Sequence, residues 1–216
     1  MCIRDRSSVG ASSQALITLG GYVTGAVLLL VATVPALPAR LVSMIPVALV
    51  LNIVVGQIIG SVGIPLYLDS TGTVLVAALA GPWAGIATCV LSSLVCSAFN
   101  PSVLPFAATS AAVGGLAGVA IKHGALKNIA TVLLSGAVIG IVVGMLAAPV
   151  AAFVYGGTAG VGTGAVVSLL REMGHSLLQS VTLQSFISDP LDKALVMLLV
   201  WLVLKSLPKR TLAAFR

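Results

Sequence analysis

The chain has 216 residues, of which 59% are hydrophobic and only 7% are charged. Soluble domains carry about a quarter charged residues, so this composition excludes a soluble enzyme, a nucleic-acid-binding domain and a secreted disulfide scaffold. We therefore interpret the net charge of +6 as a sign of membrane topology rather than of a phosphate-binding surface.

Apolar segments that approach the roughly 20 residues of a membrane-spanning helix follow one another along the chain. They predict helices over residues 14–34, 43–61, 65–80, 83–99, 103–121, 128–155 and 190–206. The expected fold is all-α, a polytopic transmembrane helix bundle. Residues 14–34 form an extra N-terminal span, and residues 42–210 form the main membrane domain. Residues 1–6 resemble a translated sequencing adapter, and we expect them to say nothing about the fold.

The charges predict an orientation. With the helices alternating in direction, most basic residues fall on one side, which the positive-inside rule assigns to the cytoplasm together with the C-terminus. These residues are Arg40, Lys122, Lys127, Lys205, Lys209, Arg210 and Arg216, whereas Arg171 and Lys193 fall outside. The acids Asp69, Glu172, Asp189 and Asp192 also fall outside. We therefore expect a polar, mildly acidic site at the outer face of a bacterial plasma membrane.

Two polar residues stand out within the apolar segments. Asp69 opens the 65–80 segment, where an acid at membrane depth indicates a functional site; alternatively, Asp69, Ser70 and Thr71 cap the helix. Asn52 lies inside the 43–61 segment. It either lines a site or hydrogen-bonds to a neighbouring helix.

The region before the last span combines a polar stripe with a helix-start pattern. Residues 165–182 predict one helix with Ser168, Glu172, His175, Gln179 and Thr182 on one face. This face is either solvated or in contact with a ligand. The Asp189-Pro190-x-Asp192 pattern then predicts the start of the last helix, with Asp189 as its N-cap and Lys193 paired to Asp189.

Aromatic residues gather near the expected outer ends of the helices. They form either an interfacial belt or rings that stack on a planar ligand. We expect an outward-facing pocket between residues 67–71, 100–106 and 156–182. The candidate substrate-binding residues are Tyr67, Asp69, Thr71, Asn100, Phe106, Glu172, His175 and Gln179.

Two motifs carry a family resemblance. One joins Asp69 to the turn Gly81-Pro82-x-x-Gly85, and the other joins Tyr155-Gly156-Gly157-Thr158 to Asp189-Pro190-Leu191-Asp192-Lys193. The sequence resembles the substrate-binding S components of energy-coupling factor (ECF) vitamin transporters over roughly residues 42–210. The resemblance implies a six-helix core that captures a vitamin-like small molecule. It also implies partners, namely a transmembrane coupling subunit and two ATPase subunits. Docking on the coupling subunit is expected at Ala48, Asn52, Gly56 and Gly60.

Other function classes lack their signatures. The two histidines, His123 and His175, fall in expected loops or outer segments, and no Walker A, G-x-S-x-G or H-E-x-x-H motif occurs in the sequence. We therefore expect a protein that is not an enzyme and that holds neither a metal nor a cofactor. An autonomous secondary transporter and a non-catalytic membrane scaffold or sensor remain the alternatives.

Overall fold

The computed structural model of the chain describes residues 4–33, 35, 37, 42–157 and 161–207. Within these ranges the chain is helical and contains no strand. Several residues used in the sequence analysis lie outside the described part: residues 1–3 of the adapter-like segment, the basic residues Arg40, Lys209, Arg210 and Arg216, and Thr158 of the second motif.

The helices follow the apolar segments until residue 155, except that α1 begins at Arg4 and that residues 65–70 of the expected 65–80 helix are not helical. In chain order they are α1 (Arg4–Thr33), α3 (Ile45–Val62), α4 (Thr71–Ala80), α5 (Pro82–Phe99), the 3-10 helix η2 (Pro101–Phe106), α6 (Ala107–Lys122), α7 (Ile129–Pro149), the π-helix η3 (Val150–Val154), α8 (Val161–Glu172) and α9 (Leu177–Ser206). Proline at the start of α3, α5 and η2 suits the first turn of a helix, where the missing N–H has no partner to lose.

Five segments in the described part of the chain are long and apolar enough to cross a membrane. They are Ala15–Thr33, Ile45–Val62, Pro82–Phe99, Pro101–Lys122 and Ile129–Val154. Helix α4 is apolar but has only 10 residues, about 15 Å at 1.5 Å per residue. Helix α9 has 30 residues but carries charges along its length. The chain is an all-α, multi-pass transmembrane helix bundle, which confirms the expected fold class.

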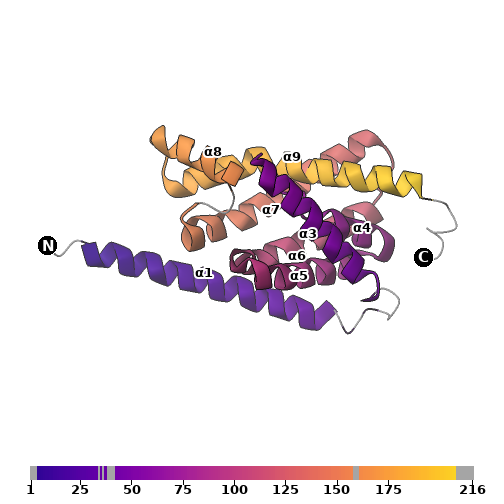
Figure 1. The fold of residues 1–216 in the computed structure, drawn as a ribbon, viewed down its shortest axis with the longest axis horizontal. Helices are drawn as coiled ribbons and strands as arrows, with labels where there is room; N and C mark the ends of the chain where they lie inside the picture. Colours follow the sequence, from indigo (N-terminus) through magenta and orange to yellow (C-terminus); the bar gives the residue numbers. More distant parts are fainter. Residues whose placement is uncertain (1–3, 34, 36, 38–41, 158–160, 208–216) are drawn as a thin grey trace.

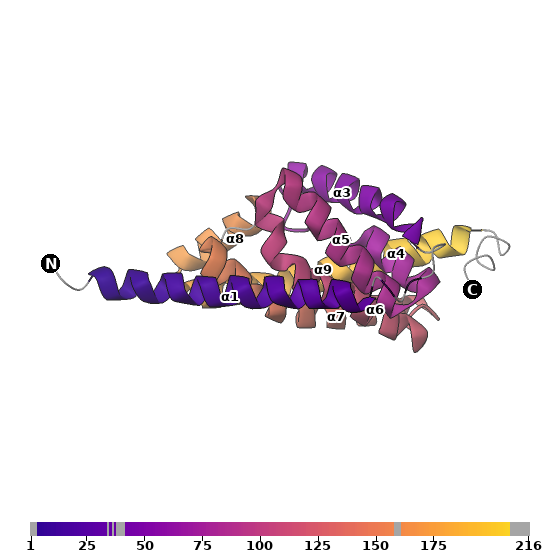
Figure 2. The ribbon, with the colours of Figure 1, turned by 90° about the horizontal axis from the view of Figure 1, so that it is seen from below.

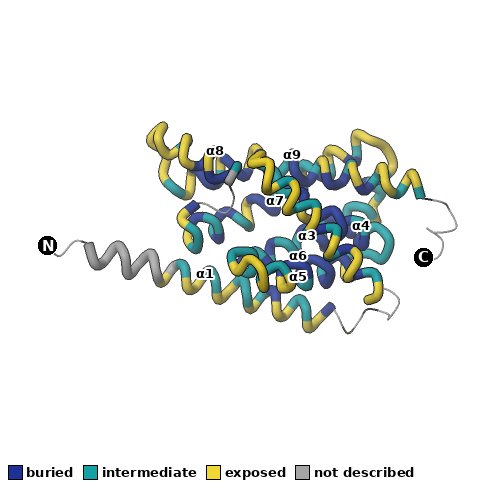
Figure 3. Tube along the Cα trace, viewed as in Figure 1, coloured by how far each residue is buried: buried dark blue, intermediate teal, exposed yellow. Residues whose placement is uncertain are grey.

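The helices pack around a centre built from α4, α6, α7 and α9. Its buried side chains include Val74, Val113, Val132, Val196 and Met197. Helix α1 runs along the outside of the bundle against α5, α6 and η3 (Figures 1 and 2). Helix α3 is the other outlying element, and exposed residues mark much of its length (Figure 3). Its side chains Val47, Val50, Ile58 and Val62 are among the exposed apolar residues of the chain, which suits contact with lipid.

Small residues on α7 let α9 approach closely. A Cβ added at Gly136 or Gly140 would lie 2.5 Å from the α9 backbone at Ala194 and 2.3 Å from it at Asp189, respectively. A Cβ at Gly144 would lie 2.6 Å from the Asp189 carboxylate. The row Gly136-x-x-x-Gly140-x-x-x-Gly144 is therefore a helix-packing face of the kind common in membranes.

Two expectations about the C-terminal region are wrong. The expected 165–182 helix is broken, because α8 ends at Glu172 and Gly174 adopts a φ of 93°. Helix α9 then begins at Leu177, where Ser176 and Gln179 form a capping box. The Asp189-Pro190 pattern consequently does not start a helix. Pro190 lies inside α9, where a membrane helix tolerates it because neighbouring groups satisfy the freed backbone.

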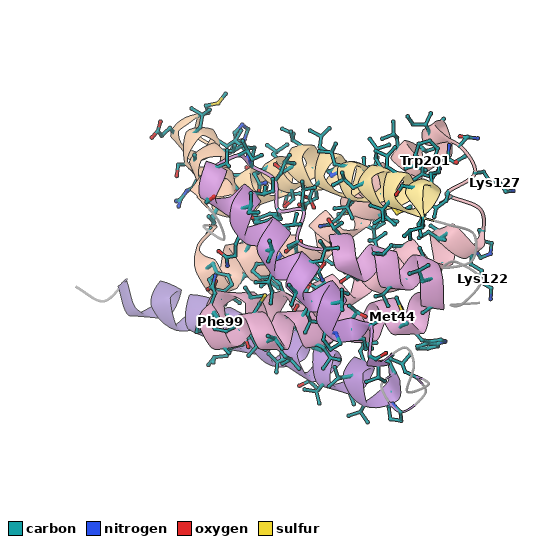
Figure 4. The ribbon with its side chains drawn as sticks, turned by 45° about the vertical axis from the view of Figure 1, so that its right-hand side comes forward. Met44, Phe99, Lys122, Lys127 and Trp201 are labelled. Atoms are coloured by element: carbon teal, nitrogen blue, oxygen red, sulfur yellow. The ribbon has the colours of Figure 1, made fainter. Side chains whose placement is uncertain are left out.

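Basic residues gather at one end of the bundle. Lys122, Lys127 and Trp201 lie together there, and Phe99 lies at the opposite end (Figure 4). The Trp201 indole N–H donates to the carbonyl of Leu126 at 3.0 Å. The Lys205 ammonium lies 3.7 Å from the centre of the Trp201 ring. The three lysines thus share one end of the bundle, as the positive-inside rule led us to expect.

Candidate functional site

A charged cluster lies between α9 and the connection from α3 to α4. The Asp192 carboxylate is fully buried. Its Oδ1 accepts hydrogen bonds from the backbone N–H groups of Tyr67 at 2.8 Å and Leu68 at 2.7 Å. Its Oδ2 accepts from the Lys193 ammonium at 2.5 Å. Asp192 therefore holds the 63–70 connection against α9.

Lys193 links Asp192 to a second acid. Its ammonium donates to the Ser70 hydroxyl at 3.2 Å and lies 3.7 Å from Asp69 Oδ1. The side chains of Lys193 and Asp192 are only 9% and 0% exposed, whereas that of Asp69 is 57% exposed. The Lys193 ammonium is thus closer to the buried carboxylate of Asp192 than to the exposed carboxylate of Asp69.

This cluster lies some distance from the end of the bundle that carries the lysines. Lys193 is 13 residues from Ser206, the last residue of α9, or about 20 Å along the helix. Asp69 precedes α4, whose 10 residues place it about 15–18 Å from the same end. Both distances fall within a hydrocarbon core of about 30 Å. These lengths are compatible with a position inside the membrane, and the placement of these acids and Lys193 at the outer face stays a prediction.

Asn52 supplies the cap that helix α4 lacks. No side chain caps α4 from its own N-cap residue, Ser70. Instead, the Asn52 Oδ1 accepts from the backbone N–H groups of Gly72 at 2.7 Å and Thr73 at 3.3 Å. Its Nδ2 donates to the hydroxyls of Thr73 and Ser92. Asn52 therefore bonds to neighbouring helices, since orphan N–H groups inside a membrane bundle need such partners, and it also lines the cavity described below.

The expected docking row on α3 lies largely against the interior. Ala48 and Asn52 are buried, and a Cβ on Gly72 would lie 2.2 Å from the Ala48 carbonyl oxygen. A Cβ on Gly56 would lie 3.1 Å from the Asp69 Cβ. Of the four residues, Gly60 has open space around it. Ala48, Asn52 and Gly56 therefore pack α3 on α4 and the 63–70 connection, and docking of a partner on this row stays a prediction.

A polar cavity of about 50 Å³ opens beside Asp69. It lies between α3, the start of α4, α5, η2 and α6. It is lined by Asn52, Asp69, Ser70, Cys89, Ser92, Ser93, Cys96, Val103, Ser110 and Val113. Asp69 forms part of its wall while remaining 57% exposed, so the cavity reaches the surface past this carboxylate. A polar space of this size holds a small hydrophilic group.

The predicted site residues fall into two groups. Asp69 lines the cavity, whereas Tyr67 and Thr71, in the same stretch of chain, do not. The Tyr67 hydroxyl lies 2.9 Å from the Thr163 hydroxyl of α8, and the Thr71 hydroxyl donates to the Leu68 carbonyl at 2.9 Å. Asn100 caps η2 by accepting from the Ser102 N–H. Phe106 stacks on Tyr155 with ring centres 5.6 Å apart. Neither Asn100 nor Phe106 lines the cavity, although Val103 of the same 3-10 helix does.

The second group lies away from the cavity. Glu172, His175 and Gln179 are exposed, and none of them lines the cavity. The Gln179 side chain is used locally, because its Oε1 accepts from the Ser176 N–H in the capping box of α9. The polar stripe of residues 165–182 is thus divided between two helices that do not continue one another.

Sequence reasoning missed most of the cavity wall. Cys89, Ser92, Ser93 and Cys96 follow the i, i+3, i+4, i+7 spacing of one helix face. That spacing was visible in the sequence, but each residue is small and ordinary in a membrane helix by itself. The Ser93 hydroxyl is the notable member, because Ser93 is 5% exposed and its hydroxyl has no hydrogen-bond partner among the described residues.

The fold and the cluster together define a multi-pass membrane protein with a polar cavity and a charged network inside the bundle. Among the described residues, no group of three His, Cys, Asp or Glu side chains is placed to hold a metal ion. Comparison with known proteins found no matching family model, no matching curated protein and no matching solved structure.

Proposed function

We propose that this chain is the membrane-embedded substrate-capture subunit of an ATP-driven ECF-type importer for a vitamin or similar small molecule. The observation that carries the proposal is the polar cavity beside Asp69, since a carboxylate inside a membrane bundle is costly and indicates function. The resemblance of the two motifs to S components supports the same conclusion. In this proposal the protein lies in a bacterial plasma membrane with its C-terminus in the cytoplasm.

The geometry suggests how capture would work. A cavity of about 50 Å³ accepts one polar group of a substrate, whereas whole ligand sites usually measure about 300–1,000 Å³. The rest of the molecule would lie over the cavity, where η2 and the 63–70 connection meet. Short segments with few buried side chains, such as η2, are suited to move as the ligand enters.

Release into the cytoplasm requires partners in this proposal. The chain has no phosphate-binding Walker A sequence, so ATP hydrolysis belongs to two ATPase subunits that act through a transmembrane coupling subunit. Because Ala48 and Asn52 are buried, we expect the contact with that coupling subunit to involve other residues of the surface.

One observation favours a second candidate, an autonomous secondary transporter. Helix α4 stops within the membrane, and an acid–base cluster lies at its start. Short helices with charges near the midplane are typical of such transporters. This candidate would couple substrate entry to an ion gradient and would need no ATPase.

The two candidates differ in their partners. The tagged chain is expressed together with a coupling subunit and an ATPase pair from an ECF system, and it is purified from mild detergent. We expect the ATPase pair to co-purify and its ATP hydrolysis to respond to the chain. The matched comparison is the purified chain alone in liposomes, loaded with a mixture of vitamins that is read by mass spectrometry. Accumulation of a vitamin by the chain alone, without co-purification of the ATPase pair, would contradict the capture-subunit proposal and favour a secondary transporter.

A further inference from the structure

The carboxyl group of Asp69 lies at the cavity with Lys193 as its basic neighbour. Lys193 is the basic residue in contact with it, and that ammonium lies 2.5 Å from Asp192 but 3.7 Å from Asp69. Asp189, one turn before Lys193 on α9, adds a third acid to the same cluster. Three acids therefore surround one lysine. No basic residue lines the cavity itself.

The wall opposite the charge offers hydrogen-bond acceptors. The Ser93 hydroxyl lines the cavity, is nine-tenths buried and has no partner in the described structure. The amide oxygen of Asn52, by contrast, is already engaged by the N-terminal N–H groups of α4. A group entering the cavity thus meets the carboxylate of Asp69 and the free hydroxyl oxygen of Ser93. Both accept hydrogen bonds from N–H donors.

The size of the cavity limits the group that enters. About 50 Å³ suits an ammonium or amidinium group but excludes an aromatic ring with its substituents. We infer that the cavity receives the positively charged head group of the substrate, with Asp69 as its counter-ion and Ser93 as a hydrogen-bond acceptor. The inference rests on the proposed capture function and specifies its substrate class: a small cation.

The cavity contains its own reporter for this charge preference. Cys96 lines it and is partly buried. With Cys2 and Cys89 replaced by serine, Cys96 becomes the single thiol of the full chain. The probes are 2-aminoethyl methanethiosulfonate, which is cationic, and 2-sulfonatoethyl methanethiosulfonate, which is anionic. Each reaction rate is divided by the rate of the same reagent with free cysteine.

We expect the cationic reagent to modify Cys96 at least about tenfold faster than the anionic one, because a charged, enclosed site concentrates its counter-ions. Asp69→Asn should bring the ratio near one, and Asp69→Glu, which keeps the charge, should preserve it. The control is Ser61→Cys in a chain without other cysteines. Ser61 is exposed and outside the cavity, so its ratio should be near one.

The outcomes separate this inference from the proposed function. Equal rates at Cys96, no reaction with either reagent, or an unchanged preference in Asp69→Asn would each overturn the cation site. ATPase co-purification would still support capture of a neutral or anionic substrate in that case. Conversely, a charge preference without ATPase co-purification would support the cation site and contradict the proposed importer function.

Discussion

Two aspartates of one cluster have opposite environments. Asp192 is sealed and fully bonded, whereas Asp69 is more than half exposed and bonded only weakly to Lys193. A buried ion pair contributes little net stability when it is intact, but breaking it leaves an uncompensated charge in the interior. Asp192 therefore belongs to the architecture, and the exposed Asp69 is the carboxylate that we propose meets the ligand.

The first prediction concerns Asp192→Asn. The substitution weakens the partner of Lys193 and replaces one acceptor by an amide N–H₂ group. We expect a loss of about 3–5 kcal/mol in the free energy of unfolding, measured by titration with a denaturing detergent. The helix-start interpretation would have allowed only up to about 1 kcal/mol.

A double variant provides the control. Asp192→Asn combined with Lys193→Met removes both charges and should recover part of the lost stability, because no ammonium remains unpaired in the interior. Equal stability of Asp192→Asn and the parent chain would contradict the buried ion pair.

At the scale of elements, the contact of α7 with α9 organises the site. The glycine row on α7 faces α9 from Asp189 to Ala194. This close approach fixes the height of Asp192 and Lys193 relative to the 63–70 connection. The packing of two helices thus determines where a charge network forms on a third segment.

The second prediction follows from this packing. In Gly140→Ala the added methyl group would lie 2.3 Å from the Asp189 carbonyl oxygen, so the helices must separate. We expect a loss of about 1–3 kcal/mol, read as a lower unfolding temperature in detergent. Gly20→Ala in α1 is the matched control, because a Cβ there meets nothing within 4 Å. That variant should be neutral or gain up to about 1 kcal/mol, and an equal loss in both variants would contradict the close packing.

At the scale of the whole molecule, the charges and the helix directions agree. Lys122, Lys127 and Lys205 lie at one end of the bundle. The C-terminal end of α5, with Phe99 and Asn100, lies at the opposite end of the bundle (Figure 4). The positive-inside rule assigns the lysine end to the cytoplasm. With that orientation, the 63–70 connection would enter the bundle from the outer side, which fits the proposed capture of an external solute.

The third prediction tests this orientation. Single cysteines are placed at Lys127 and at Asn100, both exposed, in a chain without native cysteines. A membrane-impermeant thiol reagent added outside intact cells should label position 100 and not position 127. Inside-out vesicles should give the reverse pattern. Labelling of position 127 from outside would show that the orientation is the reverse of the expected one.

Much of the helical architecture was predictable from the sequence. The apolar segments and the turn residues at Gly81-Pro82 and Asn100-Pro101 located α3, α5 and α7 to within a few residues. The start of α9 was not predicted, because Asp189-Pro190 is a stronger local start signal than Ser176. Packing against α7 and α8 overrode that preference. Local patterns thus identified the helices but not the continuity of the last one.

The candidate site was only partly predictable. Asp69 was identified from its isolation in an apolar segment, which is a local signal. Its contact with Lys193 joins residues 124 positions apart, and the cap that Asn52 provides to α4 joins residues about 20 positions apart. No local sequence pattern predicts contacts over such separations. Glu172, His175 and Gln179 shared a helical spacing but not a helix, so their expected convergence failed.

The long separation of Asp69 from its lysine has a consequence for how the protein is made. The chain reaches Lys193 only 124 residues after Asp69. At about 5–20 residues per second, that interval lasts roughly 6–25 s. During that interval α4 has neither the ammonium that contacts Asp69 nor the carboxylate that binds the N–H groups of residues 67 and 68. Until α9 is made, the connection between α3 and α4 therefore lacks the partners that hold it in the folded protein.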